Sequence, residues 1–350
     1  MIELDTLIAY AAARGASDVH LVYGLPIRLR IDGVLTDYNA DRLTDSDCEA
    51  YARRLAGDSY EQIAAIGELD GAHTFEDGTR VRINLFRQQG HISAALRLLH
   101  ATFPELQSLG LPPAVSDFPG LRRGIILVTG QTGSGKSTTL AAVLDEINHT
   151  RSAHIITLED PIEYVYTPDR CIINQREIGV DTHSYTDGLR AALREDPDVI
   201  LIGEMRDLDT IDTALTAAET GHLVFATLHT GSAADAIDRI VQVFPAGRQQ
   251  QIRMQLSMTL QAVLSQQLLP DRQGGRIAAC ELMMVTPAIR NLIREGKTPQ
   301  IANALATSAS EGSVTMDASL VRLFKAKRIS AENARAAAFD PEYVMRNTLF

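Results

Sequence analysis

The segment Gly130–Ser137 reads GQTGSGKS and fits the pattern G-x-x-x-x-G-K-[ST]. Glycines in such a loop let backbone N–H groups approach phosphate oxygens, and the N-terminus of a following helix adds partial positive charge. The apolar run IILVT precedes the loop and STTLAAVLDEI follows it, which is the strand–loop–helix setting that the pattern requires. We therefore expect an ATP-binding phosphate loop, with Lys136 at the β- and γ-phosphates and Ser137 at Mg²⁺. The expected nucleotide-binding residues are Gly130, Gln131, Thr132, Gly133, Ser134, Gly135, Lys136, Ser137 and Thr138.

A carboxylate is also needed beside the phosphates to hold Mg²⁺, either directly or through water. The apolar run VILIGE ends in Glu204 and follows the segment Asp196-Pro197-Asp198. We expect Glu204 to act on the metal side of the site and to hold Mg²⁺ together with Ser137. The alternative is that Glu204 only caps or solvates the end of a strand.

Three more acidic residues, Glu159, Asp160 and Glu163, lie in ITLEDPIEY, at the end of the apolar run HIITL. ATP hydrolysis needs a group that orients or deprotonates the attacking water, and a carboxylate at a strand end opposite the phosphate loop can do so. The spacing does not decide which of the three acts. The alternative is a solvated acidic turn enforced by Pro161.

Two histidines, His222 and His229, flank the apolar run LVFATL and should lie near opposite ends of one strand. A zinc site would need further ligands nearby, so the pattern disfavours zinc. His229 is the better candidate for a residue that senses the γ-phosphate or couples it to movement. A structural, hydrogen-bonded histidine is the alternative for either residue.

The first hundred residues predict an α+β domain. Alternation in IRLRIDGVL, with a turn signal at Asp32-Gly33, predicts one hairpin, and TRVRINLF followed by HISAALRLL predicts another strand pair. An amphipathic helix before them is indicated by apolar residues near one face of a 3.6-residue period: Ile2, Leu4, Leu7, Ile8 and Ala11.

The segment 103–124 is rich in proline and glycine and is typical of a linker. After it, short apolar runs alternate with helical stretches, which predicts a parallel sheet buried on both faces. We expect an α/β protein with three parts: an N-terminal domain and linker over 1–111, a P-loop core over 112–285 and a helical region over 286–350.

The composition is that of a globular protein. The 350 residues carry a formal net charge of −11 with a sequence pI of about 5.3, which disfavours broad binding to nucleic acid. No apolar run approaches the roughly 20 residues that cross a bilayer, so we expect a cytoplasmic protein. Cys48, Cys171 and Cys280 lie far apart and suggest neither disulfides nor a structural zinc site.

Four segments in order resemble the motifs of the secretion ATPase superfamily that powers type IV pili and type II secretion. LVTGQTGSGKSTTLAA resembles its Walker A motif, ITLEDPIEY its aspartate box, ALREDPDVILIGEMRD its atypical Walker B motif and AAETGHLVFATLHTGSAADAIDRIVQVFP its histidine box. The opening with ASDVHL and IRLRIDG is similar to the PAS-like domain of these motors. AIRNLIREGK and TMDASLVRLFKAKRISAENA are similar to the helical end of the twitching-motility retraction subfamily.

The resemblance implies a fold and residue roles. The fold is a PAS-like α+β domain followed by a RecA-like core with a helical C-terminal region. Glu163 is implied as the catalytic base, and His222 and His229 as residues that couple nucleotide state to domain movement. Arginines from the N-terminal domain complete the site in this family, and Arg82 and Arg97 are the best positional candidates. Gly90 stands where the family would place another arginine, which leaves that assignment open.

The resemblance also implies an assembly. The expected state is a homohexamer in which the N-terminal domain of one subunit packs on the ATPase core of the next. Its implied partners are an inner-membrane pilus platform protein and the assembly ATPase, with the motor peripheral at the inner face of the cytoplasmic membrane. The implied activity is ATP hydrolysis that drives pilus retraction and twitching motility.

Other functions stay open from the sequence. One alternative is a pilus-assembly, conjugative or type II secretion ATPase, although those assembly ATPases usually carry a longer N-terminal region and a tetracysteine module. Another is a nucleotide-dependent regulatory switch, which would keep Lys136 but would not need Glu163 and Glu204 together. A small-molecule kinase is disfavoured by the N-terminal domain and the helical tail.

Overall fold

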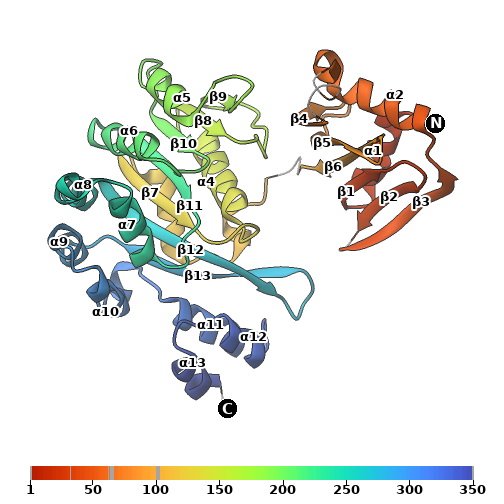
Figure 1. Ribbon diagram of the computed structural model, residues 1–350. Coiled ribbons are helices and arrows are strands. Elements are labelled where there is room, and N and C mark those ends of the chain that lie inside the picture. Colours follow the sequence, from red (N-terminus) through yellow and green to blue (C-terminus); the bar gives the residue numbers. More distant parts are fainter. Residues whose placement is uncertain (1, 32, 62, 64–66, 100–102, 349–350) are drawn as a thin grey trace. The chain divides into compact units, whose positions relative to one another are not determined.

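The computed structural model describes residues 2–31, 33–61, 63, 67–99 and 103–348. The chain divides into two compact units, one made of residues 1–102 with 163–165 and one made of residues 103–162 with 166–350 (Figure 1). None of the helices in these described ranges is long and apolar enough to cross a membrane.

The first unit is built on an antiparallel sheet with the strand order β3-β2-β1-β6-β5-β4. The helix α1 buries Leu4, Leu7, Ile8 and Ala11, the face that the 3.6-residue period predicts. The elements of this unit are α1 (Leu4–Ala13), β1 (Ala16–Leu21), β2 (Pro26–Ile31), β3 (Val34–Arg42), α2 (Asp45–Ala56), a 3₁₀ turn (Gly57–Ser59), β4 (Glu68–Thr74), β5 (Arg80–Gln88) and β6 (His91–Leu98).

Both predicted strand pairs are present in this unit. β2 pairs with β3 in the register Ile31↔Val34, although Asp32 of the predicted turn lies outside the described residues. β5 pairs with β6, and Val81, Ile83 and Leu85 are buried as the alternation predicts. α2 and β4 are not predicted by the alternation and complete the sheet and its covering layer.

The second unit begins with the proline-rich segment 103–124, which folds as two 3₁₀ turns, Leu106–Leu109 and Pro113–Gly120. Leu106, Val115 and Phe118 from these turns are buried in one core cluster with residues of α4. The prolines and glycines therefore do not leave this segment irregular, because its apolar side chains pack on the core.

The sheet of the second unit has the strand order β13-β12-β7-β11-β10-β8-β9. Every neighbouring pair in the described sheet is parallel except β12 and β13, which form an antiparallel hairpin. The strands are β7 (Gly124–Thr129), β8 (His154–Glu159), β9 (Ile172–Glu177), β10 (Val199–Ile202), β11 (Leu223–Leu228), β12 (Leu260–Pro270) and β13 (Arg276–Met284).

Helices cover both faces of this sheet, so its central strands are buried along their whole length. On β7, Ile126 and Val128 pack in the cluster that contains α4, whereas Ile125 and Leu127 pack in the cluster that contains α6, α7 and α8. The helices are α4 (Lys136–Thr150), α5 (Tyr185–Ala192), α6 (Leu208–Glu219), α7 (Ala233–Gln242) and α8 (Ala246–Thr259).

The C-terminal region is helical and packs in two places. α9 and α10 bury Ile289, Ile293, Ile301 and Leu305 in the cluster of α6 to α8. α11, α12 and α13 share a separate small core with β13. The elements are α9 (Pro287–Glu295), a 3₁₀ turn (Thr298–Gln300), α10 (Ile301–Thr307), a 3₁₀ turn (Ala309–Glu311), α11 (Met316–Lys325), α12 (Ala331–Ala336) and α13 (Pro341–Thr348).

Candidate active site

The phosphate loop connects β7 to α4, in the strand–loop–helix setting that the sequence predicts. Gly135 is the N-cap residue of α4 and has a φ of 93°, a left-handed conformation that favours glycine. Lys136 is buried, and its Nζ donates to the carbonyl oxygens of Gly130 at 2.8 Å and Gln131 at 3.1 Å. The loop therefore folds around the ammonium group of Lys136. When a nucleotide binds, its phosphate oxygens can replace the two carbonyl oxygens as acceptors for this group.

Gly130 admits no larger side chain. Its φ is 142°, and a Cβ added there would overlap the carbonyl oxygen of Gln266 on β12 and lie 2.5 Å from the Oγ of Ser134. The first glycine of the loop is therefore fixed both by its own backbone and by the neighbouring strand.

The carboxyl ends of four neighbouring parallel strands meet at one edge of the sheet, which we call the carboxyl edge. Along the order β7, β11, β10, β8, this edge presents Gly130, His229, Glu204 and Glu159. Since adjacent strands lie about 4.8 Å apart, Glu204 is two strand positions, or about 10 Å, from the phosphate loop. This is the usual location of ligand sites in parallel α/β sheets.

Glu204 forms an ion pair with Arg206 at 2.6 Å, and its other carboxylate oxygen lies 3.2 Å from His229 Nε2. Burial alone would raise the pKa of Glu204, but the hydrogen bond from Arg206, together with His229, brings it below its usual value. Glu204 is therefore ionised at neutral pH, as a ligand of a metal or of its water must be. Arg206 was not singled out from the sequence.

The two histidines lie at opposite ends of β11, as the spacing predicts. His229 reaches Glu204 at the carboxyl edge, whereas His222 precedes the strand at the other edge. The Nδ1 of His222 lies 2.9 Å from the carbonyl oxygen of Ala217 and 3.1 Å from the Oγ1 of Thr220, both at the end of α6. The geometry therefore places His229 in the candidate site and gives His222 a structural role.

The three acids at the end of β8 and in the loop after it differ in their surroundings. Glu159 accepts hydrogen bonds from Thr157 Oγ1 at 2.6 Å and from Gln175 Nε2 at 3.2 Å. Asp160 and Glu163 are exposed, and within the described part of the chain Glu163 has no hydrogen bond or ion pair. Asp160 also has no hydrogen bond or ion pair there, so both residues are free to meet a water molecule without breaking a contact.

Tyr185, at the start of α5, is a residue of this edge that the sequence did not single out. Burial, together with the negative charges of Asp160, Glu204 and Glu159, raises the pKa of Tyr185 well above its usual range. Its hydroxyl stays protonated as a potential donor among these carboxylates. No sequence signal marks it, because its position depends on how α5 packs beside β8 and β10.

A cavity of about 400 Å³ adjoins the phosphate loop on the side of the β12–β13 hairpin. Gly135 and Thr138 of the loop and α4 form one wall, and Leu268 and Ile277 from the hairpin form an apolar wall opposite. Arg328, from the segment after α11, also lines the cavity. Its volume and mixed lining suit the base and ribose of a nucleotide whose phosphates lie on the loop.

The two candidate arginines of the first unit lie side by side. Arg82 on β5 is the cross-strand partner of Arg97 on β6, and both side chains are exposed. Arg97 Nε donates to Asp18 at 2.9 Å. Burial alone would raise the pKa of Asp18, but the hydrogen bonds from Ser17 and from Arg97 bring it below its usual value. With Asp18 the two arginines line a hollow of about 230 Å³.

The oxygen atoms of Ser137 and Glu204 are suitable ligands for Mg²⁺. Ser137 in the first turn of α4 is exposed, and Glu204 is ionised at the same edge of the sheet. Mg²⁺ keeps several waters and needs only one or two protein oxygens when it is bound with phosphates, so this sparse set is sufficient. His, Cys, Asp and Glu side chains do not cluster in threes as a possible metal site anywhere in the described residues.

The parallel sheet, the phosphate loop after β7 and the acid after β10 define a P-loop ATPase with a RecA-like core. The family model of the type II/IV secretion system proteins matches residues 1–323. The chain therefore belongs to this family. Its fold confirms the expected N-terminal domain and RecA-like core.

Similar proteins carry names from pilus biology. The chain is 46% identical over 342 residues to the type IV pilus retraction ATPase PilT of Pseudomonas aeruginosa, covering 97% of this chain and 99% of the relative. It is 49% identical over 276 residues to a twitching motility protein of Neisseria gonorrhoeae, covering 79% and 74%. A crystal structure of the pilus retraction motor PilT with bound ADP superimposes with a TM-score of 0.93 at 47% identity, covering 99% and 100% of the two chains.

Proposed function

We propose that this protein is the ATP-hydrolysing motor that drives retraction of a type IV pilus. The observation that carries the proposal is the similarity over nearly the whole chain to a pilus retraction ATPase, joined to the paired Glu204 and His229 beside the phosphate loop. A regulatory switch would not require an ionised metal-side acid with a histidine beside it. Loss of hydrolysis through these residues is therefore expected to stop retraction.

The nucleotide site is proposed to work as follows. The backbone N–H groups of the phosphate loop and Lys136 bind the phosphates, and Ser137 and Glu204 hold Mg²⁺, which offsets negative charge on the phosphates. The base and ribose occupy the cavity between Thr138 and Leu268. In this arrangement Lys136 exchanges its two carbonyl partners for phosphate oxygens.

Glu163 is the proposed general base, as the family resemblance implies, and it is exposed and unpaired among the described residues, as is Asp160 of the same loop. β8 is three strand positions from β7, or about 14 Å, so Glu163 must reach the attacking water through the loop that begins at Asp160. His229 contacts Glu204 and is proposed to report the state of the γ-phosphate to the rest of the core.

The assembly is proposed to be a homohexamer in which Arg82 and Arg97 of one subunit complete the site of another. The support for this assignment is that two adjacent arginines are exposed on one face of the first unit, and guanidinium groups can stabilise the charge of transferring phosphate once Arg97 leaves Asp18. The proposed partners are an inner-membrane platform protein and the pilus assembly ATPase, which would place the motor at the cytoplasmic face of the membrane.

The test is a deletion of the gene, complemented with the wild-type gene, with Glu204→Gln or with an exposed-surface control, Arg239→Ala. Surface pili are counted by electron microscopy, and twitching is measured on agar. Retraction predicts abundant pili without twitching in the deletion and in the Glu204→Gln strain, and full rescue by the control.

Two outcomes would contradict the proposal. Cells without pili would assign the motor to pilus assembly. Unchanged pili and twitching would assign it to another secretion or transfer machine that uses the same kind of ATPase.

A further inference from the structure

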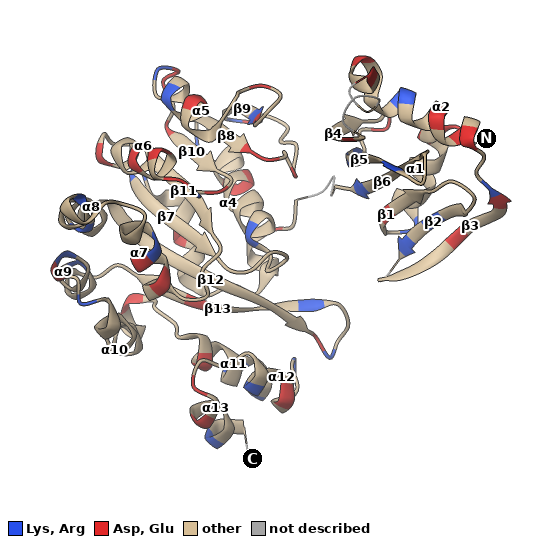
Figure 2. Ribbon diagram, in the orientation of Figure 1, with Lys and Arg blue, Asp and Glu red and all other residues tan. Residues whose placement is uncertain are grey.

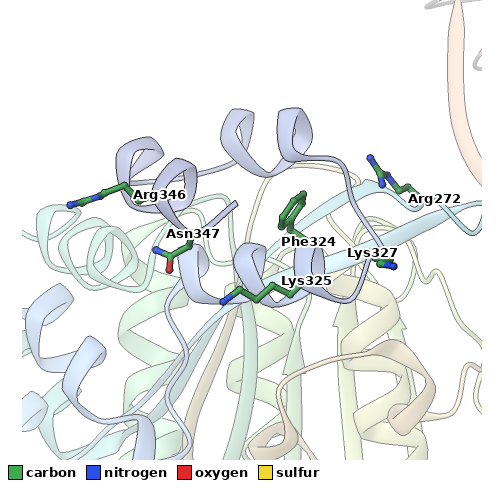
Figure 3. Close-up of a pocket in the computed structure, with 6 residues that line it drawn as sticks. All are labelled: Arg272, Phe324, Lys325, Lys327, Arg346 and Asn347. Carbon is green, nitrogen blue, oxygen red and sulfur yellow. The ribbon is translucent and has the colours of Figure 1, made fainter. Parts of the chain in front are cut away.

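A second cavity, of about 620 Å³, lies in the C-terminal region and away from the phosphate loop (Figure 3). Three segments form it: the turn of the β12–β13 hairpin, the end of α11 with the residues after it, and α13. We call it the basic groove, and its lining residues are Arg272, Phe324, Lys325, Lys327, Arg346 and Asn347.

The four cations of the groove are exposed, and none of them forms an ion pair with an acidic residue of the described chain. The neighbouring Arg328 behaves differently, since its Nε donates to both carboxylate oxygens of Asp271 at 3.0 and 3.1 Å. Figure 2 shows basic residues on α11 and α13 in a chain whose net charge is −11. Unpaired cations that gather against the overall charge indicate a site for an anion.

Helix dipoles account for only part of this cluster. Lys325 and Arg346 lie in the last turns of α11 and α13, where cations are favourable. Arg272 and Lys327 lie outside helices, so no helix dipole stabilises their charges. Lys327 has a φ of 58°, a left-handed conformation that favours glycine, so a lysine is present there against the backbone preference.

The groove is held in shape by contacts of its walls. The backbone N–H of Arg272 donates to the carbonyl oxygen of Arg328 at 2.7 Å, which ties the hairpin turn to the end of α11. Asp317 of α11 accepts from the backbone N–H groups of Phe339 at 2.8 Å and Asp340 at 3.1 Å, just before α13. A ligand would therefore meet a preorganised surface.

The shape of the groove favours an extended ligand. Figure 3 shows Arg346 at one end, Arg272 at the other, and Phe324 between them. A single phosphate group would contact only part of this row, whereas a peptide with several carboxylates can follow it. Phe324 is half-buried and offers an apolar contact, and the amide of Asn347 can bond a peptide backbone.

We propose that the basic groove binds an acidic peptide segment of a partner protein. Its carboxylates would pair with the four cations, and one apolar side chain would pack on Phe324. The proposal does not depend on which machine the motor drives, because it rests only on the charges and shape of this region.

The test uses the full-length protein and a fluorescent peptide of alternating Glu and Ser with one central Phe, with a Gln-for-Glu peptide as the ligand control. The groove variant replaces Arg272, Lys325, Lys327 and Arg346 by Ala. A charge-matched variant replaces four other exposed arginines by Ala: Arg170, Arg239, Arg322 and Arg335. We expect the groove variant to bind the Glu peptide at least about tenfold more weakly than wild type, and the matched variant to bind nearly as wild type does.

ATP hydrolysis and oligomeric state are measured on all three proteins to show that they are folded. Equal loss in the two variants, or no binding of the Glu peptide to wild type, would overturn the proposal. Dissociation of the oligomer in the groove variant alone would assign the groove to a second copy of this chain. Groove-dependent binding of tripolyphosphate or anionic lipid vesicles, without peptide binding, would assign it to phosphate groups instead.

Discussion

Polar side chains at the two ends of the parallel sheet in the second unit differ in the kind of partner to which they bond. At the carboxyl edge, Glu204 pairs with the side chains of Arg206 and His229, and Glu159 with that of Gln175. At the opposite edge, which we call the amino edge, polar side chains bond mainly to the backbone.

Arg151 shows the arrangement at the amino edge. Its guanidinium donates to the carbonyl oxygens of Pro119 at 3.1 Å and Leu121 at 2.8 Å. Asp198 likewise accepts from the backbone N–H of His154 at 2.8 Å. The partners of polar groups at the carboxyl edge, including the loop carbonyls bonded to Lys136, lie where a nucleotide can replace them. The backbone partners of Arg151 and Asp198 lie at the other edge, away from the phosphate loop. The amino edge therefore serves stability, and the carboxyl edge can exchange partners during a reaction.

The largest expected effect is at the carboxyl edge. Glu204→Gln removes the ionised acid while keeping the shape, so ATP hydrolysis should fall at least about 100-fold with nucleotide binding nearly unchanged. Steady-state hydrolysis and equilibrium binding of a fluorescent ATP analogue measure the two quantities. Glu163→Gln, tested beside it, should also lower kcat without weakening binding. Wild-type turnover in Glu163→Gln would remove that residue as the base.

At the amino edge, Arg151→Met should lower stability rather than activity. The substitution keeps an apolar stem but leaves the carbonyl oxygens of Pro119, which is buried, and Leu121, which is half-buried, without this donor, at a cost of about 1–3 kcal/mol. The midpoint of urea denaturation measures the loss, and hydrolysis at a temperature where the variant is folded should match wild type. A selective loss of kcat in the folded variant would contradict the division between the two edges.

The two histidines that flank β11 allow the amino edge and the carboxyl edge to be compared on a single strand. His229→Asn removes a partner of Glu204 and should lower hydrolysis about tenfold or more, with little change in stability. His222→Asn should instead lower stability by roughly 1 kcal/mol and leave kcat nearly unchanged. Both variants are made in the same background and measured in the same assays. If His222→Asn lost activity as strongly as His229→Asn, a purely structural role for His222 would be wrong.

Glu281 on β13 is an acid whose partners are backbone groups, unlike the acids of the carboxyl edge. Among the substitutions considered, its replacement should change stability or activity least. It is buried and accepts from the backbone N–H of Ala233 at 2.8 Å, at the start of α7, and from that of Met316, at the start of α11. Burial outweighs these hydrogen bonds and raises the pKa of Glu281.

A raised pKa in the folded protein sets the sign of the pH dependence. The stability that protonated Glu281 contributes is complete below its ordinary pKa and is lost as pH rises through the folded value. Glu281→Gln cannot ionise, so its melting temperature should rise relative to wild type between about pH 5 and pH 8. A difference in melting temperature that stays constant over this range would contradict a raised pKa.

The sequence predicts the parts of the site that lie within one strand and its loop. The apolar runs that become β7, β8, β10 and β11 are bounded by the phosphate loop, the acids and the histidines, so their positions could be predicted. Lys136 and Glu204 follow from the chemistry that ATP and Mg²⁺ require.

Contacts that depend on strand order could not be predicted. Glu204 and His229 are brought together because β10 and β11 are neighbours, and Tyr185 joins them only through the packing of α5. The cavity for the base needs the β12–β13 hairpin, whose sequence mixes buried polar residues such as Gln266 with apolar ones and gives no clear alternation.

Arg328 lines the cavity next to the phosphate loop and also pairs with Asp271, the neighbour of Arg272 in the basic groove. Arg328 thus connects the cavity to the residue next to Arg272, one of the cations of the basic groove. If a nucleotide changes the affinity of the groove for its ligand by some factor, thermodynamic linkage requires the ligand to change nucleotide affinity by the same factor. Measuring either affinity with the other site filled gives this coupling free energy, and Arg328→Lys should bring the factor closer to one.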